Sequence, residues 1–124
     1  MMSILSLFKF VKDQVTFPAG HVIFKEDETG DVAYVVIEGE VDVTFKGHLL
    51  ETVGAGGLIG EMALIDAQTR SGTATAKTEV RAVKIDKNRF TFMVQETPMF
   101  ALEVMKIMAD RLRHDHERMD SVQG

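Results

Sequence analysis

The residues with the clearest chemical potential lie in the middle of the chain, in residues 57–76. Gly60 is followed directly by Glu61, a short apolar turn comes next, and the loop after it ends in Arg70 and Ser71. A glycine lets the backbone approach a ligand closely, an arginine pairs with an anion through a fixed fork of donors, and a carboxylate accepts a hydrogen bond from a hydroxyl. This combination predicts a cradle for one small, negatively charged molecule that carries a hydroxyl group.

Short strands predicted over residues 14–85 must position this cradle. Apolar and β-branched runs alternate there with turn signals such as Pro18-Ala19-Gly20, a pattern typical of a strand-rich fold. The expected strands cover residues 14–17, 21–24, 32–37, 41–45, 48–53, 72–78 and 80–85. About eight short strands at this spacing favour an antiparallel sandwich or barrel, with the β jelly roll as the leading candidate. Only the turn from Glu61 to Ile65 is predicted to be helical in this zone.

Helical periodicity predicts an N-terminal helix over residues 1–13. Its apolar side chains fall on one stripe, formed by Ile4, Leu7, Phe8 and Val11. This stripe favours a short amphipathic lid packed on the domain over a membrane anchor, which would carry more basic residues on its polar face.

Two further helices are predicted over residues 86–120. Asp86 is expected to cap the first, and Thr97 to cap a second that begins at Pro98 and runs to about Met119. The second helix carries an apolar stripe of Ala101, Val104, Met105, Met108 and Leu112, broadened by Phe100 and Ile107. The expected fold class is therefore mainly β with flanking helices, in a single domain over residues 1–124.

The amino-acid composition argues against several classes of protein function. The 124 residues are 45% apolar and carry a net charge of −5, so one domain with a hydrophobic core is expected and disorder is not. Without a cluster of basic residues, nucleic-acid binding is not expected. The absence of cysteine excludes disulfides and thiol chemistry. No apolar run approaches the ~20 residues that span a membrane, which favours a cytoplasmic protein with no membrane partner.

Many residues occur in the order and spacing of one known family. They are Phe17-Pro18-Ala19-Gly20, Ile23-Phe24, Glu26, Gly30-Asp31, Tyr34, Ile37, Gly39, Val41, Gly56, Gly60-Glu61, Ala63-Leu64-Ile65, Arg70-Ser71 and Ala74. In this set the chain resembles the cyclic-nucleotide-binding domains of catabolite-activator proteins and protein-kinase regulatory subunits, with residues 57–74 as the phosphate-binding cassette. The resemblance implies a β jelly roll flanked by helices, with cAMP or cGMP as a ligand cupped in the barrel and no cofactor.

The resemblance also assigns roles to residues of the cassette. Glu61 would accept a hydrogen bond from the ribose 2′-hydroxyl, and Arg70 would pair with the cyclic phosphate while Ser71 donates beside it. The backbone amides of Gly60 and of the turn after it would complete the anion site. The candidate ligand-binding residues are Gly60, Glu61, Met62, Ala63, Arg70 and Ser71.

Two functions follow as hypotheses. The first is a regulatory sensor that binds cAMP or cGMP and relays binding through its C-terminal helices. The alternative is a module that keeps the fold without the ligand and acts in dimerisation, as a C₂ homodimer, or in binding a partner protein. The base of the nucleotide and the residue that caps it stay open.

Several of these residues also have interpretations that involve no ligand or catalysis. Glu61 and Arg70 could form an ordinary surface ion pair. His114 and His116 are two positions apart on a helix, so they point apart and do not favour a metal site. His21 and His48 are too few for a metal-dependent cupin, and no arrangement of nucleophile and base favours an enzyme.

Overall fold

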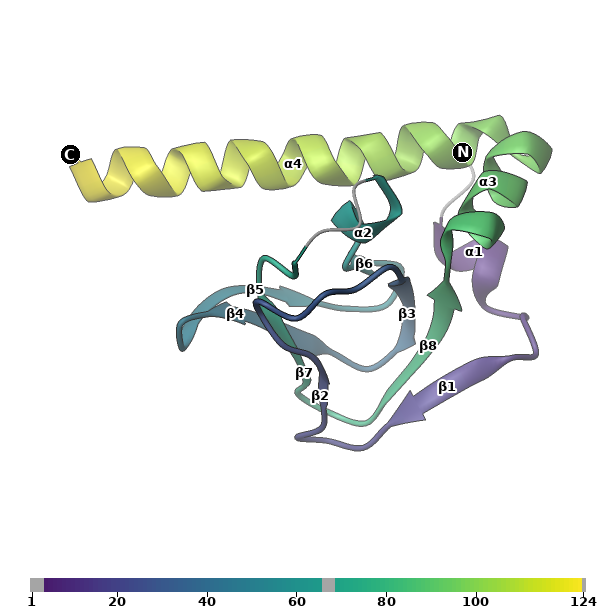
Figure 1. The fold of residues 1–124 in the computed structure, drawn as a ribbon, viewed down its shortest axis with the longest axis horizontal. Helices are drawn as coiled ribbons and strands as arrows, with labels where there is room; N and C mark the ends of the chain where they lie inside the picture. The colour runs from purple at the N-terminus through teal and green to yellow at the C-terminus, as the bar shows by residue number, and fades with distance from the viewer. Residues whose placement is uncertain (1–3, 66–68, 124) are drawn as a thin grey trace.

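Two antiparallel sheets form the body of the molecule (Figure 1). A computed structural model describes residues 4–65 and 69–123, with side chains described up to residue 113. The first sheet has the order β1-β8-β3-β6 and the second the order β2-β7-β4-β5. The strands are β1 (Gln14–Phe17), β2 (Val22–Phe24), β3 (Ala33–Glu38), β4 (Val41–Phe45), β5 (His48–Val53), β6 (Leu58–Ile59), β7 (Thr73–Ala76) and β8 (Val80–Ile85). The expected mainly β jelly roll with flanking helices is confirmed.

The first sheet is buried on both of its faces. Along β3, Val36 lies in the core between the two sheets, whereas Val35 and Ile37 lie in a second core under the helices. Successive side chains of a strand point to opposite faces, so a continuous apolar run is what a doubly covered strand requires. On β8, Ala82 and Val83 divide between the two cores in the same way.

Four helices flank the sheets, namely α1 (Ile4–Phe8), α2 (Met62–Ile65), α3 (Lys87–Glu96) and α4 (Pro98–Gln123). Asp86 caps α3 by accepting a hydrogen bond from the Arg89 backbone amide at 2.7 Å. Figure 1 shows α4 crossing the top of the sheets, with its C-terminal part extending beyond them. It ends at Gln123, a few residues past the predicted end.

The predicted N-terminal helix over residues 1–13 is too long. Among the described residues α1 ends at Phe8, and residues 1–3 lie outside them. Phe8 is buried, and the chain must then turn to reach β1, whose Gln14 pairs with Val83 of β8. Pairing of β1 with the sheet therefore overrides the helical periodicity that extends to Val11.

The apolar stripe of α4 is rotated from the predicted one. Phe100 and Val104 are buried in the core under the helices, with Ile107 and Met108 packed against it. Met105 and Leu112, which were predicted to share that stripe, are 57% and 60% exposed. Phe100 sets this orientation, because its ring lies 5.7 Å from that of Phe8 and 5.8 Å from that of Phe90.

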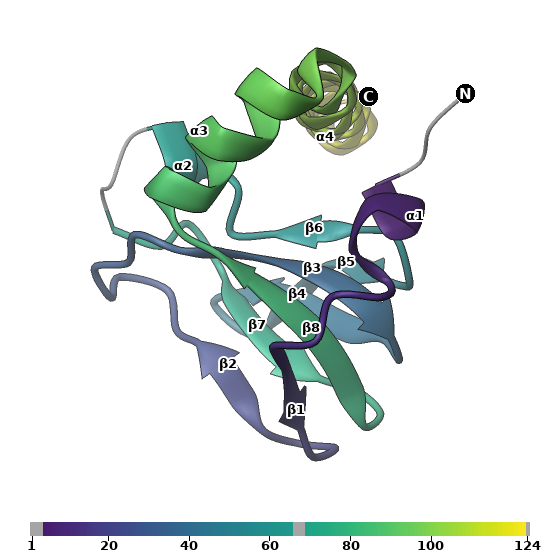
Figure 2. The same cartoon turned by 90° about the vertical axis from the view of Figure 1, so that its right-hand side faces the viewer.

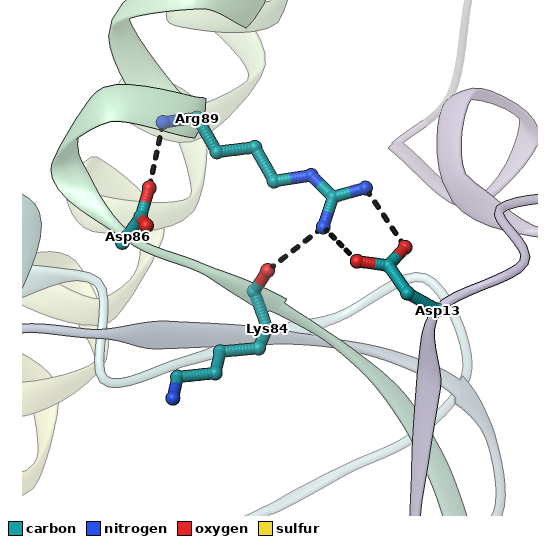
Figure 3. Close-up of polar contacts among 4 residues, drawn as sticks. All are labelled: Asp13, Lys84, Asp86 and Arg89. Atoms are coloured by element: carbon teal, nitrogen blue, oxygen red, sulfur yellow. Dashed lines mark hydrogen bonds and ion pairs between the residues drawn. The ribbon is translucent and has the colours of Figure 1, made fainter.

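An ion pair ties the segment after α1 to the first turn of α3 (Figure 3). Arg89 Nη1 donates to Asp13 Oδ2 at 3.1 Å and Nη2 donates to Asp13 Oδ1 at 3.2 Å, while Nη1 also donates to the carbonyl of Lys84. The hydrogen bond and the charge of Arg89 lower the pKa of Asp13. This two-pronged contact links α3, β8 and the segment before β1.

The lowered pKa of Asp13 predicts a pH-dependent contribution to stability. A carboxyl whose pKa is lower in the folded state stabilises the fold above its unfolded pKa of ~3.9, and the contribution is lost as the pH falls through the folded value. In Asp13→Asn this carboxyl is absent, so we expect the free energy of unfolding to fall less steeply with decreasing pH than in the unchanged protein. NMR titration of the Asp13 carboxyl should give a pKa below ~3.9, and a value at or above it would contradict the ion pair.

Candidate functional site

Arg70 is a buried arginine whose charge has no carboxylate partner among the ion pairs of the described residues. It is 8% exposed, and its guanidinium carbon lies 4.1 Å from the centre of the Phe24 ring. Its Nη2 donates to the carbonyl of Val32 at 2.8 Å. Its Nη1 is buried and has no hydrogen-bond partner. Since buried donors are nearly always paired, this free donor marks a place where an acceptor fits.

Two glycines allow the guanidinium of Arg70 to sit against the backbone. A Cβ atom placed on Gly60 would lie 2.6 Å from Arg70 Nη1, and one placed on Gly30 would lie 2.3 Å from Arg70 Nε. Gly60 also has a φ of 72°, a backbone angle that residues with a side chain rarely adopt. The cradle expected around Gly60 therefore closes on Arg70 itself.

Burial has the largest effect on the pKa of Arg70. Burial lowers the pKa of Arg70, and the nearby carboxylates of Asp31 and Glu28, together with Tyr34, partly offset this by raising it. An arginine remains protonated at neutral pH through such shifts, because its ordinary pKa lies far above neutrality. The site thus holds a desolvated positive charge with an unused donor.

Backbone pairing fixes the loop that carries Arg70. The Arg70 amide donates to the carbonyl of Glu28 at 2.7 Å, and its carbonyl accepts from the Asp27 amide at 3.0 Å. Thr29 and Thr69 form an antiparallel bridge beside them. The end of the cassette is thereby held against the loop between β2 and β3, while residues 66–68 of the cassette lie outside the described residues.

Gly30→Ala should displace the arginine without changing any charged group. The added methyl would lie 2.3 to 2.5 Å from three atoms of the guanidinium, too close for van der Waals contact, so Arg70 must leave its niche. We expect the affinity for an anionic ligand to fall by about tenfold or more, in the range of a misplaced binding group. Isothermal titration with the ligand proposed below measures this, and unchanged affinity would show that the niche is dispensable.

Glu61 is buried on the other side of Gly60 and pairs with an arginine of α4. It is 7% exposed, and its Oε1 accepts from Arg111 Nη1. The alternative of a surface ion pair between Glu61 and Arg70 is therefore wrong, because both are buried and Glu61 binds a different arginine. Glu61 remains a carboxylate that can accept a further hydrogen bond.

Arg111 joins α4 to the sheets through three contacts. Besides Glu61, it donates from Nε to Glu51 of β5 at 3.0 Å and from Nη2 to the carbonyl of Leu58 in β6. Burial alone would lower the pKa of Arg111, but the two carboxylates outweigh it and the pKa is raised. The charge of Arg111 is thus permanent and locally neutralised.

Arg111 was not among the predicted site residues. The signal was present in the periodicity of α4, since Arg111 continues the series Phe100, Val104 and Ile107 at helical spacings of four and three. A charged residue on the buried face of a helix needs a partner. Only the fold shows that this partner is Glu61.

The other predicted site residues surround Glu61 and Arg70 in different ways. Met62 and Ala63 open α2, where Ala63 is buried and Met62 is exposed. Ser71 follows Arg70 and is exposed just before β7. The structure thus brings Gly60 and Arg70 into contact and places Glu61 beside them, whereas Met62 and Ser71 lie at the surface.

The described part of the chain contains neither a cluster of metal-binding side chains nor a membrane-spanning helix. No group of three or more His, Asp or Glu side chains is placed there to hold a metal ion. Within the same residues, no helix combines the length and apolar character needed to cross a bilayer. The side chains of His114 and His116 lie outside the described ones.

Comparison with known proteins agrees with this geometry. Residues 14–97 match the family described as "Cyclic nucleotide-binding domain". The chain is 32% identical over 110 residues to a CRP-like cAMP-activated global transcriptional regulator of Mycobacterium tuberculosis, covering 85% of this chain and 49% of the regulator. It is 37% identical over 94 residues to a cyclic nucleotide-gated potassium channel of Rhizobium etli, covering 76% of this chain and 26% of the channel.

The fold has similar solved structures. The Thermus thermophilus catabolite activator protein superposes with a TM-score of 0.79 at 27% identity, over 97% of this chain and 57% of that one. This chain spans about half the length, or less, of the curated relatives described above. The similarity therefore concerns one domain of larger regulatory proteins.

Proposed function

We propose, since this chain belongs to the cyclic nucleotide-binding domain family, that it binds cAMP or cGMP between Arg70 and Glu61 as a regulatory module. The observation that carries the proposal is the buried guanidinium of Arg70, with an unpaired Nη1 donor in a niche lined by glycine. A cyclic phosphate carries one negative charge, which this guanidinium can neutralise through charge-assisted hydrogen bonds. The cassette amides at Gly60 and Met62, with Ser71, would complete the anion site beside Ala63, whose own amide donates to the Gly60 carbonyl at 3.1 Å.

The ribose would be recognised by Glu61. An ionised carboxylate only accepts hydrogen bonds, and Arg111 uses one oxygen of Glu61. The other oxygen could accept the 2′-hydroxyl. Two or three charge-assisted contacts of ~1.5–3 kcal/mol each, with base stacking, are consistent with micromolar affinity, near −8 kcal/mol.

Binding at Glu61 would reach α4 directly through Arg111. A ligand shifts a conformational equilibrium only as far as its affinity differs between the two states. Because Glu61 contacts both the proposed ligand and α4, a hydrogen bond to its carboxylate changes the energy of the α4 contact. We therefore propose a sensor without catalytic activity or a cofactor, as one domain over residues 1–124 in the cytoplasm, that signals through its C-terminal helices.

An interaction role is supported by a separate observation on α4. Leu102, Met105 and Leu112 are all more than half exposed and recur at spacings of three and seven, as on one face of a helix. Exposed apolar surface of this kind favours association. We propose a C₂ homodimer or a partner protein at this face, with nucleic acid and membranes excluded as direct partners.

Titration calorimetry with cAMP and cGMP tests the sensor. 5′-AMP serves as the matched control, because it keeps the base and ribose but has an open phosphate. Saturable heat with one cyclic nucleotide and a much weaker response to 5′-AMP would support the proposal and identify the base. No heat with either cyclic nucleotide at millimolar concentration would contradict the sensor proposal. Light scattering of the same samples gives the mass and decides between monomer and dimer.

A further inference from the structure

Glu51 lies outside the cassette but contacts the same arginine as Glu61. It belongs to β5, the edge strand of the second sheet, and lies 60 positions before Arg111 in the sequence. Its Oε2 accepts from Arg111 Nε at 3.0 Å. The Arg111 side chain is 25% exposed and that of Glu51 is 42% exposed, so the contact is partly shielded from water.

The three contacts of Arg111 occupy all three nitrogens of its guanidinium. Nε faces Glu51, Nη1 faces Glu61 and Nη2 faces the carbonyl of Leu58. A guanidinium is planar, with donors in a rigid fork, so fixing Nε fixes the direction in which Nη1 points. Glu51 and the Leu58 carbonyl therefore both constrain where Arg111 meets Glu61.

We propose that Glu51 is a positioning residue that holds Arg111, and with it α4, against β5 and β6. The inference rests on the proposed function for its effect on ligand affinity, but not for its effect on α4. A carboxylate that shares its lone pairs with a ligand hydroxyl attracts Arg111 less strongly. Glu51 provides a second carboxylate on the opposite edge of the guanidinium, so Arg111 stays docked while Glu61 is engaged.

Two carboxylates give Arg111 one acidic partner more than neutralising its charge requires. Glu51, Glu61 and Arg111 carry a combined charge of −1. Removing the charge of Glu51 leaves Arg111 with one carboxylate, which must then serve both the helix and the proposed ligand. The docking of α4 and the recognition of ribose would compete for Glu61.

The first arm of the test follows amide hydrogen exchange of α4 without nucleotide. Glu51→Gln keeps the shape of the side chain and its place in β5 but removes the charge. We expect peptides covering residues 100–113 to exchange about three- to tenfold faster than in the unchanged protein, the scale of a partly exposed charged contact. Glu79→Gln is the matched control, because Glu79 is exposed and belongs to the connection between β7 and β8. This connection lies at the opposite end of the sheets from α4 (Figures 1 and 2).

Unchanged exchange in Glu51→Gln would overturn the proposal. Equal acceleration in Glu79→Gln would overturn it as well, because the effect would then follow net charge instead of contact with Arg111. Glu51→Asp, which keeps the charge on a shorter side chain, should restore part of the protection. A fold control by circular dichroism ensures that both variants keep the β content of the unchanged protein.

The second arm measures affinity for cAMP in a double-mutant cycle with Arg111→Gln. If Glu51 acts through Arg111, Glu51→Gln weakens binding about three- to tenfold, and the double variant binds no more weakly than Arg111→Gln alone. Additive losses would show that Glu51 acts independently and would overturn the positioning role. If the unchanged protein binds no nucleotide, the proposed function fails, while the exchange arm still decides whether Glu51 holds α4.

Discussion

Arg70→Ala is expected to abolish most of the affinity for a cyclic nucleotide. Removing a buried partner of a charged group costs ~2–5 kcal/mol, which corresponds to a roughly 30- to 5,000-fold weaker dissociation constant. Arg70 is the only guanidinium in the described residues that is buried with an unpaired donor, so no neighbouring group can replace it. Calorimetric titration measures the change.

The stability of Arg70→Ala should change far less than its affinity. Burial already disfavours the charged form of Arg70, and its loss relieves that penalty while removing the hydrogen bond to Val32 and the contact with Phe24. Arg81→Ala is the matched control, because Arg81 lies in an exposed ion pair with Glu38 and should leave the affinity unchanged. An Arg70→Ala protein that binds as tightly as the unchanged one would contradict the site, and a weakly binding Arg81→Ala would point to a general charge effect.

Phe100→Ala is expected to give the largest loss of stability. Phe100 is fully buried and contacts both Phe8 of α1 and Phe90 of α3. Truncating a buried phenylalanine costs ~3–5 kcal/mol, because the transfer free energy of the ring is lost and a cavity remains. For a domain of this size we expect the Tm to fall by roughly 10–20 °C, measured by calorimetry or circular dichroism.

Phe92→Ala provides the matched control for Phe100→Ala. Phe92 is 58% exposed on α3, and surface substitutions usually change stability by about 0.5 kcal/mol or less. Phe100→Leu should fall between the two variants, because a leucine fills part of the space. If Phe100→Ala and Phe92→Ala lowered the Tm equally, the aromatic cluster would not be what anchors α4.

The sequence predicted the strands well because their signals are local. Alternation of apolar and polar side chains located β4, the range predicted for β8 matches the observed strand, and Asp86 marked the start of α3. Where a local signal competed with a distant contact, the distant contact prevailed. The stripe of α1 extended to Val11, but pairing of β1 with β8 ended the helix at Phe8.

The residues of the candidate site also differ in whether a local signal could predict them. Gly60, Glu61 and Arg70 lie within ten residues of one another, so a motif could predict them together, with the glycine explained by its φ of 72°. The niche around Arg70 also needs Phe24 at the end of β2 and Gly30 in the loop between β2 and β3, and neither belongs to the cassette. Their contribution depends on the pairing of that loop with the cassette.

By itself, the sequence determined the fold class, the residue types of the cradle, and the order of the helices and of every strand except the two-residue β6, because these follow from periodicity, turn residues and short spacings. Only the tertiary structure decided which carboxylates Arg111 meets and which face of α4 is buried. A helical stripe specifies that a face is apolar, but its rotation is fixed by the partners that it packs against. Arg111 is far from Glu51 and Glu61 in the sequence, and the three form one set of contacts because the fold brings β5, the cassette and α4 together.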